Sequence, residues 1–292
     1  MAVFYNQATL SYNGNVTSSN IITGELIEVL SAAKNAVIDT YSPDNDNVFV
    51  ISITNTGETP YTDLTVTDDL GRYDFGEEGS ETQLVPLVYE ENSVNYYVNG
   101  VQQPTPVVTE TEPLTITGIT VPAGGNAIII YAAKADQYAP LGENASITNT
   151  ATIAGEGLCT PITAAATITP LNTADLAISK SVNPASVPEN GQLTYTFIIQ
   201  NYGSAAALDT DNVVFRDIFN PILAITSVSF NDTVWIEGTN YNYTAADGDF
   251  ISTEGSITVP AADFIQDPVT GAWSVQPGTS TLIITGNVNN CP

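Results

Sequence analysis

Histidine is absent from this chain of 292 residues, and lysine and arginine together number only five. Without histidine the chain lacks the side chain most often used as a general base or metal ligand, and it contains no Gly-x-Ser-x-Gly elbow. We therefore expect a protein that is not an enzyme and needs no cofactor. The 32 acidic residues give a net charge of −27, which repels nucleic acid and anionic membranes as partners.

Long apolar runs are also absent. No segment is apolar over the length that spans a bilayer, so membrane insertion is not expected. The first seven residues lack the basic and apolar parts of a signal peptide, which was removed or never used. No apolar period of 3.6 residues extends over a typical helix, whereas period-2 alternation recurs throughout. The chain is predicted to be all-β.

An internal repeat organises the sequence. Three pairs of segments match between the two halves: 49–57 with 195–203, 64–68 with 213–217, and 121–124 with 275–278. After these matches the first copy continues through two more predicted strands, 146–153 and 162–168, whereas the second copy stops. We therefore predict two tandem β-sandwich domains, residues 31–171 and residues 172–292, of which the second lacks its closing strands.

The missing strands have a counterpart at the start of the chain. Residues 5–10 align position by position with residues 148–153, and a turn and a second strand follow them. Residues 1–30 are thus predicted to form a spare closing hairpin. An open sandwich exposes unpaired backbone groups and an apolar slot. Because the first domain lies between hairpin and slot, donation of the hairpin to another copy is simpler than folding back.

These repeats resemble the Ig-like repeat of bacterial and archaeal surface proteins that is known as domain of unknown function eleven. The resemblance is carried by residues 175–184, residues 195–203 and Asn149-Thr150-Ala151-Thr152. It covers nearly the whole chain and implies an Ig-like β-sandwich for each repeat. Within that family, a chain of two repeats also looks like the major subunit of clostridial spore appendages, which implies a filament on a spore surface.

Polar residues interrupt the predicted apolar faces at equivalent positions of the two repeats. Residues two apart in a strand share a face, and this places Lys34 and Lys180, half a chain length apart, among apolar neighbours. Two sets of three residues result: Lys34, Asp68 and Asn149 in the first repeat, and Lys180, Asp217 and the donated Asn6 in the second.

Both sets have the composition of an autocatalytic isopeptide site. Burial favours a neutral lysine and a neutral aspartic acid. The lysine amine is then a nucleophile that attacks the asparagine amide, assisted by the acid, and ammonia is lost. We expect Lys34–Asn149 to form within one chain and Lys180–Asn6 between two. The alternative is a buried Lys–Asp ion pair with the asparagine hydrogen-bonded beside it.

Two further patterns concern ions and thiols. Asp44 and Asp46 lie in a loop that suggests Ca²⁺ binding, although the spacing falls short of a complete calcium loop. Two cysteines are too few for a disulfide framework. Tracing of the strand directions brings Cys291 of one copy close to Cys159 of the next, so an intermolecular disulfide is predicted. The alternative is two unrelated free thiols.

Together these patterns favour a structural subunit whose partner is itself. The subunits would join head to tail into an extracellular or spore-surface filament, assembled in the mother cell. The alternative is an adhesin or a glycan-binding module of a larger surface protein. Trp235 and Trp273 are candidates for stacking on a sugar in that case, although strand aromatics more often pack across strands.

Overall fold

The computed structural model describes residues 2–42, 45–142 and 144–290, and most of these residues lie in β-strands. Strands β7 (Asp46–Asn55) and β16 (Asn126–Ala135) show why, because every second side chain along most of their length is buried. Within these ranges there is no α-helix, and η1 (Asp209–Asp211) is a single 3₁₀ turn. No helix in the described part of the chain is long and apolar enough to cross a membrane. The all-β prediction is confirmed.

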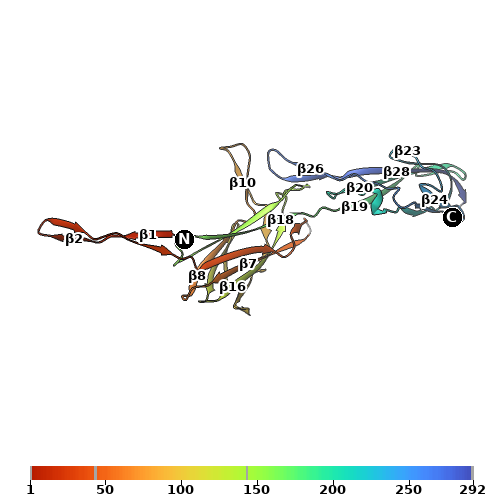
Figure 1. Cartoon of the computed structure of the whole chain (residues 1–292). Coiled ribbons are helices and arrows are strands. Elements are labelled where there is room, and N and C mark those ends of the chain that lie inside the picture. Colours follow the sequence, from red (N-terminus) through yellow and green to blue (C-terminus); the bar gives the residue numbers. More distant parts are fainter. Residues whose placement is uncertain (1, 43–44, 143, 291–292) are drawn as a thin grey trace.

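The chain is elongated and has three parts (Figure 1). A hairpin projects from one end, and two bodies follow it. Each body surrounds its own apolar core, the first built from residues between Leu30 and Ile168 and the second from residues between Leu193 and Val288. We call these bodies the first domain and the second domain.

The first domain is a sandwich of two sheets. The order of the first sheet is β13-β12-β16-β7-β5 with β11 also on β16, and that of the second is β14-β15-β8-β17-β18-β6. Besides β7 and β16, the strands are β5 (Leu30–Ala36), β6 (Thr40–Tyr41), β8 (Tyr61–Asp68), β11 (Leu87–Tyr89), β12 (Asn95–Val98), β13 (Val101–Gln102), β14 (Val107–Thr111), β15 (Leu114–Val121), β17 (Ile147–Ala154) and β18 (Ile162–Pro170). Strands β17 and β18 form the predicted closing hairpin, in which β17 pairs with β8 and β18 packs against β5.

The second domain repeats this plan without the closing hairpin. Its larger sheet has the order β19-β20-β28-β22-β23, and its smaller sheet has the order β21-β25-β24. The strands are β19 (Leu176–Asn183), β20 (Gln192–Asn201), β21 (Arg216–Ile218), β22 (Ile222–Phe230), β23 (Thr233–Val234), β24 (Tyr241–Thr244), β25 (Asp249–Ser252) and β28 (Gly278–Asn290). All residues of β19 are exposed, whereas the equivalent strand β5 buries Leu30 and Lys34. In the described residues, the edge of β21 that corresponds to the β17 side of β8 has no partner strand. The second domain is therefore open on this side.

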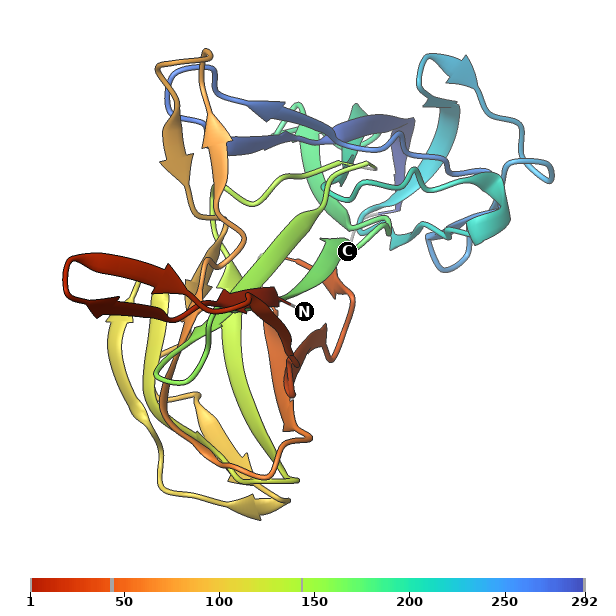
Figure 2. The same ribbon diagram turned by 60° about the vertical axis from the view of Figure 1, so that its left-hand side comes forward.

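The N-terminal hairpin extends away from the first domain, as the turned view also shows (Figure 2). It contains four short strands: β1 (Ala2–Asn6), β2 (Thr9–Tyr12), β3 (Asn15–Ser18) and β4 (Ile22–Leu26). A two-residue turn joins β2 to β3, and Asn13 and Gly14 both adopt positive φ angles, of 51° and 77°. Asn-Gly is the dipeptide that such a turn favours. Apolar side chains along the hairpin are exposed, among them Leu10 at 66%.

One part of the predicted repeat alignment is wrong. The segment equivalent to residues 121–124 is not 275–278 but begins at Val259, since the five residues 119–123 and 257–261 are identical in sequence. The structure gives them the same role. Asn55 Nδ2 donates to the Pro122 carbonyl at 3.0 Å, and Asn201 Nδ2 donates to the Pro260 carbonyl at 3.0 Å.

The misalignment hid an insertion in the second domain. Strands β26 (Asp263–Gln266) and β27 (Trp273–Gln276) form a hairpin between the matched segment and β28. This hairpin lies beside the one formed by β9 (Tyr73–Phe75) and β10 (Thr82–Leu84) of the first domain (Figure 1). The backbone N–H of Trp273 donates to the Gln137 carbonyl at 2.8 Å. The insertion therefore braces the two domains against each other.

Candidate crosslinking site and acceptor groove

The structure brings the three candidate residues of the first repeat together. Lys34 comes from β5, Asp68 ends β8 and Asn149 lies in β17, so the closing hairpin delivers the asparagine to the other two residues. Lys34 Nζ donates to Asp68 Oδ2 at 2.6 Å. The exposed fractions of Lys34, Asp68 and Asn149 are 5%, 0% and 0%, so the site is closed to solvent.

A fourth residue completes this cluster, and the sequence reasoning missed it. The hydroxyl of Tyr131, in β16, donates to Asp68 Oδ2 at 2.8 Å. It also accepts a hydrogen bond from Asn149 Nδ2 at 2.8 Å. Tyr131 occupies a buried position of an alternating strand, where an aromatic side chain is ordinary core. The only signal in the sequence is that Tyr131 shares a face with Ile129 in an alternating strand.

Burial moves both charged groups of the site towards their neutral forms. Desolvation lowers the pKa of Lys34, with the neighbouring Asp68 opposing the shift. Desolvation likewise raises the pKa of the Asp68 carboxyl, with Lys34 opposing it. The Phe49 ring lies 5.1 Å from Lys34 Nζ and adds an apolar wall. A neutral amine beside a neutral acid is the state in which the lysine is nucleophilic.

The amide of Asn149 is only half satisfied. Its Nδ2 is bound to the Tyr131 hydroxyl, whereas its Oδ1 is buried without a hydrogen-bond partner among the described residues. An unpaired buried carbonyl oxygen is energetically costly. The Asp68 side chain meets Asn149 through Tyr131 and not through the carbonyl, which differs from the direct assistance expected from the sequence.

In the second domain the structure brings together two of the three candidates. Lys180 Nζ lies 2.5 Å from Asp217 Oδ2, and the side chains are 43% and 19% exposed. The rings of Tyr195, Phe197 and Phe219 surround the ammonium group at 4.7 to 5.5 Å. Asn6 lies in β1, in the hairpin at the opposite end of the molecule (Figure 1). This pair therefore has the arrangement of the first site without its asparagine.

The two sites also differ at the position of the tyrosine. In the first domain Phe49 pairs with Tyr131 across β7 and β16. In the second domain the equivalent residue Tyr195 pairs with Ile284. Strand register therefore places an isoleucine where the first site has its hydroxyl group.

An apolar groove runs along the open side of the second domain. Its volume is about 280 Å³, and β19 and the segment leading into β21 form its walls. The lining includes Leu176, Ile178, Val213, Phe215 and Ile257. Ile178 is 57% exposed. In the first domain the closing hairpin covers the equivalent surface.

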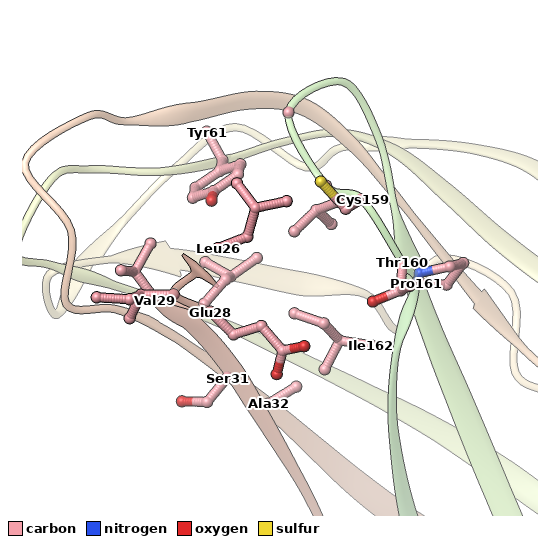
Figure 3. A pocket seen from close by; sticks show the side chains of 14 residues that line it. Leu26, Glu28, Val29, Ser31, Ala32, Tyr61, Cys159, Thr160, Pro161 and Ile162 are labelled. Carbon is pink, nitrogen blue, oxygen red and sulfur yellow. The ribbon is translucent and has the colours of Figure 1, made fainter. Parts of the chain in front are cut away.

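A second hollow lies at the base of the N-terminal hairpin (Figure 3). Its volume is about 670 Å³, and the turn between β17 and β18 forms one wall, with Leu26 and Val29 on the other. Cys159 lies in that turn with an exposed, free thiol. Cys291, its predicted partner, lies outside the described residues.

The structure describes the remaining candidates only in part. Asp44 lies outside the described residues, and Asp46 Oδ1 is 3.4 Å from Lys134 Nζ. Within the described ranges, no three acidic, cysteine or histidine side chains are grouped to hold a metal ion. Trp235 is buried and packs on Phe230 with ring centroids 5.1 Å apart. Because Trp273 belongs to the brace, the two tryptophans form no common platform for a sugar.

No family model matches the chain, and no curated protein matches its sequence. Among solved structures the chain is similar to BcpA, the major pilin subunit of Bacillus cereus, at 12% identity over 70% of this chain and 69% of that chain, with a TM-score of 0.35. It is also similar to a 35 kDa C-terminal fragment of the major pilin GBS80 of Streptococcus agalactiae, at 11% identity over 86% and 91% of the two chains, with a TM-score of 0.34.

A red sea bream transglutaminase matches at 13% identity over 86% of this chain and 31% of that chain, with a TM-score of 0.28. Similarities this low assign neither a family nor a function. The resemblance to the surface-protein repeat therefore stays a prediction, and the functional conclusion depends on the geometry of the molecule itself.

Proposed function

We propose that the chain is the structural subunit of a surface filament, in which the N-terminal hairpin of one copy closes the open second domain of another. The observation that carries the proposal is the complementarity of the two ends. One end presents an exposed apolar hairpin, and the other presents a groove from which such a hairpin is missing. The division into hairpin (1–30), first domain (31–171) and second domain (172–292) is part of the proposal.

The first domain supplies the docking geometry. There β17 pairs with β8 so that Ala151 opposes Asp68 and Ile153 opposes Val66. With Asn6 in the place of Asn149, the donated strand sets Ala8 opposite Asp217 and Leu10 opposite Phe215. Leu10 then enters the groove, and Asn6 reaches the Lys180–Asp217 pair.

Burial of the hairpin supplies the driving force. Complete burial of one large apolar side chain is worth about 1.5–3 kcal/mol, and Phe4 and Leu10 are 46% and 66% exposed in the single chain. The new strand also pairs the open edge of β21, which otherwise has unsatisfied backbone groups. Because the first domain separates hairpin and groove (Figure 1), this closure takes place between copies.

Covalent bonds reinforce the filament in this proposal. Lys34 joins Asn149 within each chain with Asp68 assisting, and Lys180 joins Asn6 of the donor with Asp217 assisting. Cys291 of the acceptor pairs with Cys159 of the donor, whose turn faces the base of the hairpin. We place the filament on the surface of a spore. The subunits assemble there while the spore is still inside the mother cell.

Removal of residues 1–20 tests the proposal. Negative-stain microscopy of the truncated chain is expected to show no filaments, since the donor strand is gone. Two point variants give a finer comparison: Leu10→Asp places a charge in the groove, whereas the adjacent Ser11→Asp faces away from it under strand alternation. Filaments of normal length from the truncated chain or from Leu10→Asp would contradict hairpin donation, and loss of assembly in Ser11→Asp would show that the assay is not specific to the groove.

A further inference from the structure

Four polar groups form one unbroken chain inside the first domain. Lys34 Nζ contacts Asp68 Oδ2 at 2.6 Å, the same oxygen contacts the Tyr131 hydroxyl at 2.8 Å, and that hydroxyl contacts Asn149 Nδ2 at 2.8 Å. This series of hydrogen bonds begins at Lys34 Nζ, the nucleophile of the proposed crosslink, and ends at Asn149 Nδ2, its leaving group. Tyr131 is completely buried, so its hydroxyl has no route to bulk water.

The chemistry of the bond requires proton transfer between these two ends. When Nζ bonds to the amide carbon of Asn149, it must lose a proton. When the bond from that carbon to Nδ2 breaks, Nδ2 must gain one, since an amide anion is a very poor leaving group. General acid–base groups supply such transfers when they lie within hydrogen-bond distance of the reacting atoms.

We propose that Tyr131 is a catalytic residue of the Lys34–Asn149 crosslink, passing the proton of Asp68 to the departing amide nitrogen. This inference rests on the proposed crosslink and assigns it a residue. Both hydrogen bonds of Tyr131 reverse in the reacting state, because Asp68 is protonated on Oδ2 and Nδ2 gains a lone pair once the attacked carbon is tetrahedral. Asp68 then gives its proton to the Tyr131 oxygen while the hydroxyl proton moves to Nδ2. Nζ, now bonded to the carbon, returns a proton to Asp68, and ammonia leaves. Asp68 and Tyr131 end in their starting states, and no other reactant is consumed.

The surroundings suit the tyrosine to this task. Its ring is held between Phe49, stacked at 5.4 Å, and Tyr89 at 6.4 Å, so the hydroxyl position is fixed. Burial and the nearby Asp68 raise the pKa of Tyr131 well above its usual value. The hydroxyl therefore keeps its proton and can both donate and accept. The more exposed second site, with Ile284 in the equivalent position, lacks this relay.

Cell-free synthesis of the full chain provides the test. Samples quenched at intervals are analysed by intact mass for the loss of one ammonia, and peptide mapping assigns the loss to Lys34–Asn149. Tyr131→Phe keeps the ring and removes the hydroxyl, so we expect bond formation at least about tenfold slower than in the wild type. Tyr96→Phe removes a hydroxyl elsewhere in the same core, where it donates to the Thr120 carbonyl at 2.8 Å, and is expected to leave the rate unchanged.

A second variant covers the case in which Tyr131→Phe does not fold. A ring-fluorinated tyrosine introduced at position 131 keeps the size of the side chain and makes the hydroxyl more acidic. If the hydroxyl transfers a proton, the rate must change; an unchanged rate overturns the relay. Equal rates in wild type and folded Tyr131→Phe also overturn the relay but leave the crosslink standing. A wild-type chain that never loses ammonia at this site refutes the crosslink and the relay together, while the microscopy above still decides hairpin donation.

Discussion

Lys34 and Asp68 are buried ionisable groups, and before any crosslink forms each is the hydrogen-bond partner of the other. A buried ion pair contributes little against an apolar replacement, but loss of one partner leaves the other charge without compensation. The equivalent pair Lys180–Asp217 is partly open to solvent. The same substitution should therefore have different consequences in the two domains.

In an Asn149→Ala background, where no crosslink can form, we expect Lys34→Met to destabilise the first domain by about 3–5 kcal/mol, because Asp68 is left buried and unpaired. The double variant Lys34→Met/Asp68→Leu should recover much of this loss, while the matched change Lys180→Met should cost less than about 1 kcal/mol. Urea unfolding gives the free energy of unfolding of each domain. Far-UV circular dichroism follows the whole chain. Tryptophan fluorescence follows the second domain, which contains both Trp235 and Trp273. Equal losses for Lys34→Met and Lys180→Met would contradict the difference in burial.

The sequence predicted three of the four residues in the first site. Lys34, Asp68 and Asn149 are visible because a polar residue on an apolar strand face breaks the alternation. Tyr131 does not break it, and only the register of β16 against β7 shows that its hydroxyl meets the other three. Asn55 and Asn201 are a second case. The sequence aligned them correctly as equivalent residues, but their hydrogen bonds to Pro122 and Pro260 join segments distant in sequence and are visible only in the structure.

Among the elements, the β26–β27 hairpin is one that sequence reasoning did not find. The N-terminal hairpin was predictable, since Asn13-Gly14 between apolar strands specifies a tight turn from local sequence alone. The β26–β27 hairpin follows the segment 257–261 that is identical to 119–123, and the match of residues 275–278 to 121–124 placed the repeat on the far side of this hairpin. Its role as a brace depends on contacts with another domain, on which local sequence carries no information.

Gly271 offers a test of the brace. Its φ is +75°, and a side chain there would begin 2.3 Å from Leu84 of the first domain. We expect Gly271→Val to separate the hairpins and broaden the distribution of interdomain distances measured by small-angle X-ray scattering. Gly238→Val is the matched control, because Gly238 has the same φ of +75° with open space around it. Both variants carry the strain of about 1–2 kcal/mol for a left-handed residue, so equal scattering curves would contradict a bracing role.

At the scale of the whole molecule, the two unlike ends would give the proposed filament a polarity. A growing filament presents a free hairpin at one end and a free groove at the other. A subunit that accepts a hairpin but cannot donate one should therefore stop growth wherever it is added.

We expect Leu10→Asp subunits, mixed in small amounts with the wild type, to shorten filaments in proportion to their mole fraction. They bind through an intact groove and present a hairpin that no further copy accepts. Length distributions from negative-stain images provide the measurement, and Ser11→Asp serves as the neutral addition. Shortening by both variants, or by neither, would show that the ends do not join in the proposed way.

The open side of the second domain also links folding to subunit supply. The first domain is complete within one chain, because β17 and β18 close it. In the proposed filament the second domain gains its last strands from a neighbour, so its completion is a bimolecular event and follows mass action. Its stability rises with the concentration of free hairpins, whereas that of the first domain does not. A cell that releases these subunits slowly would hold them as half-closed monomers, and a rapid burst of synthesis would complete the second domains as the filament forms.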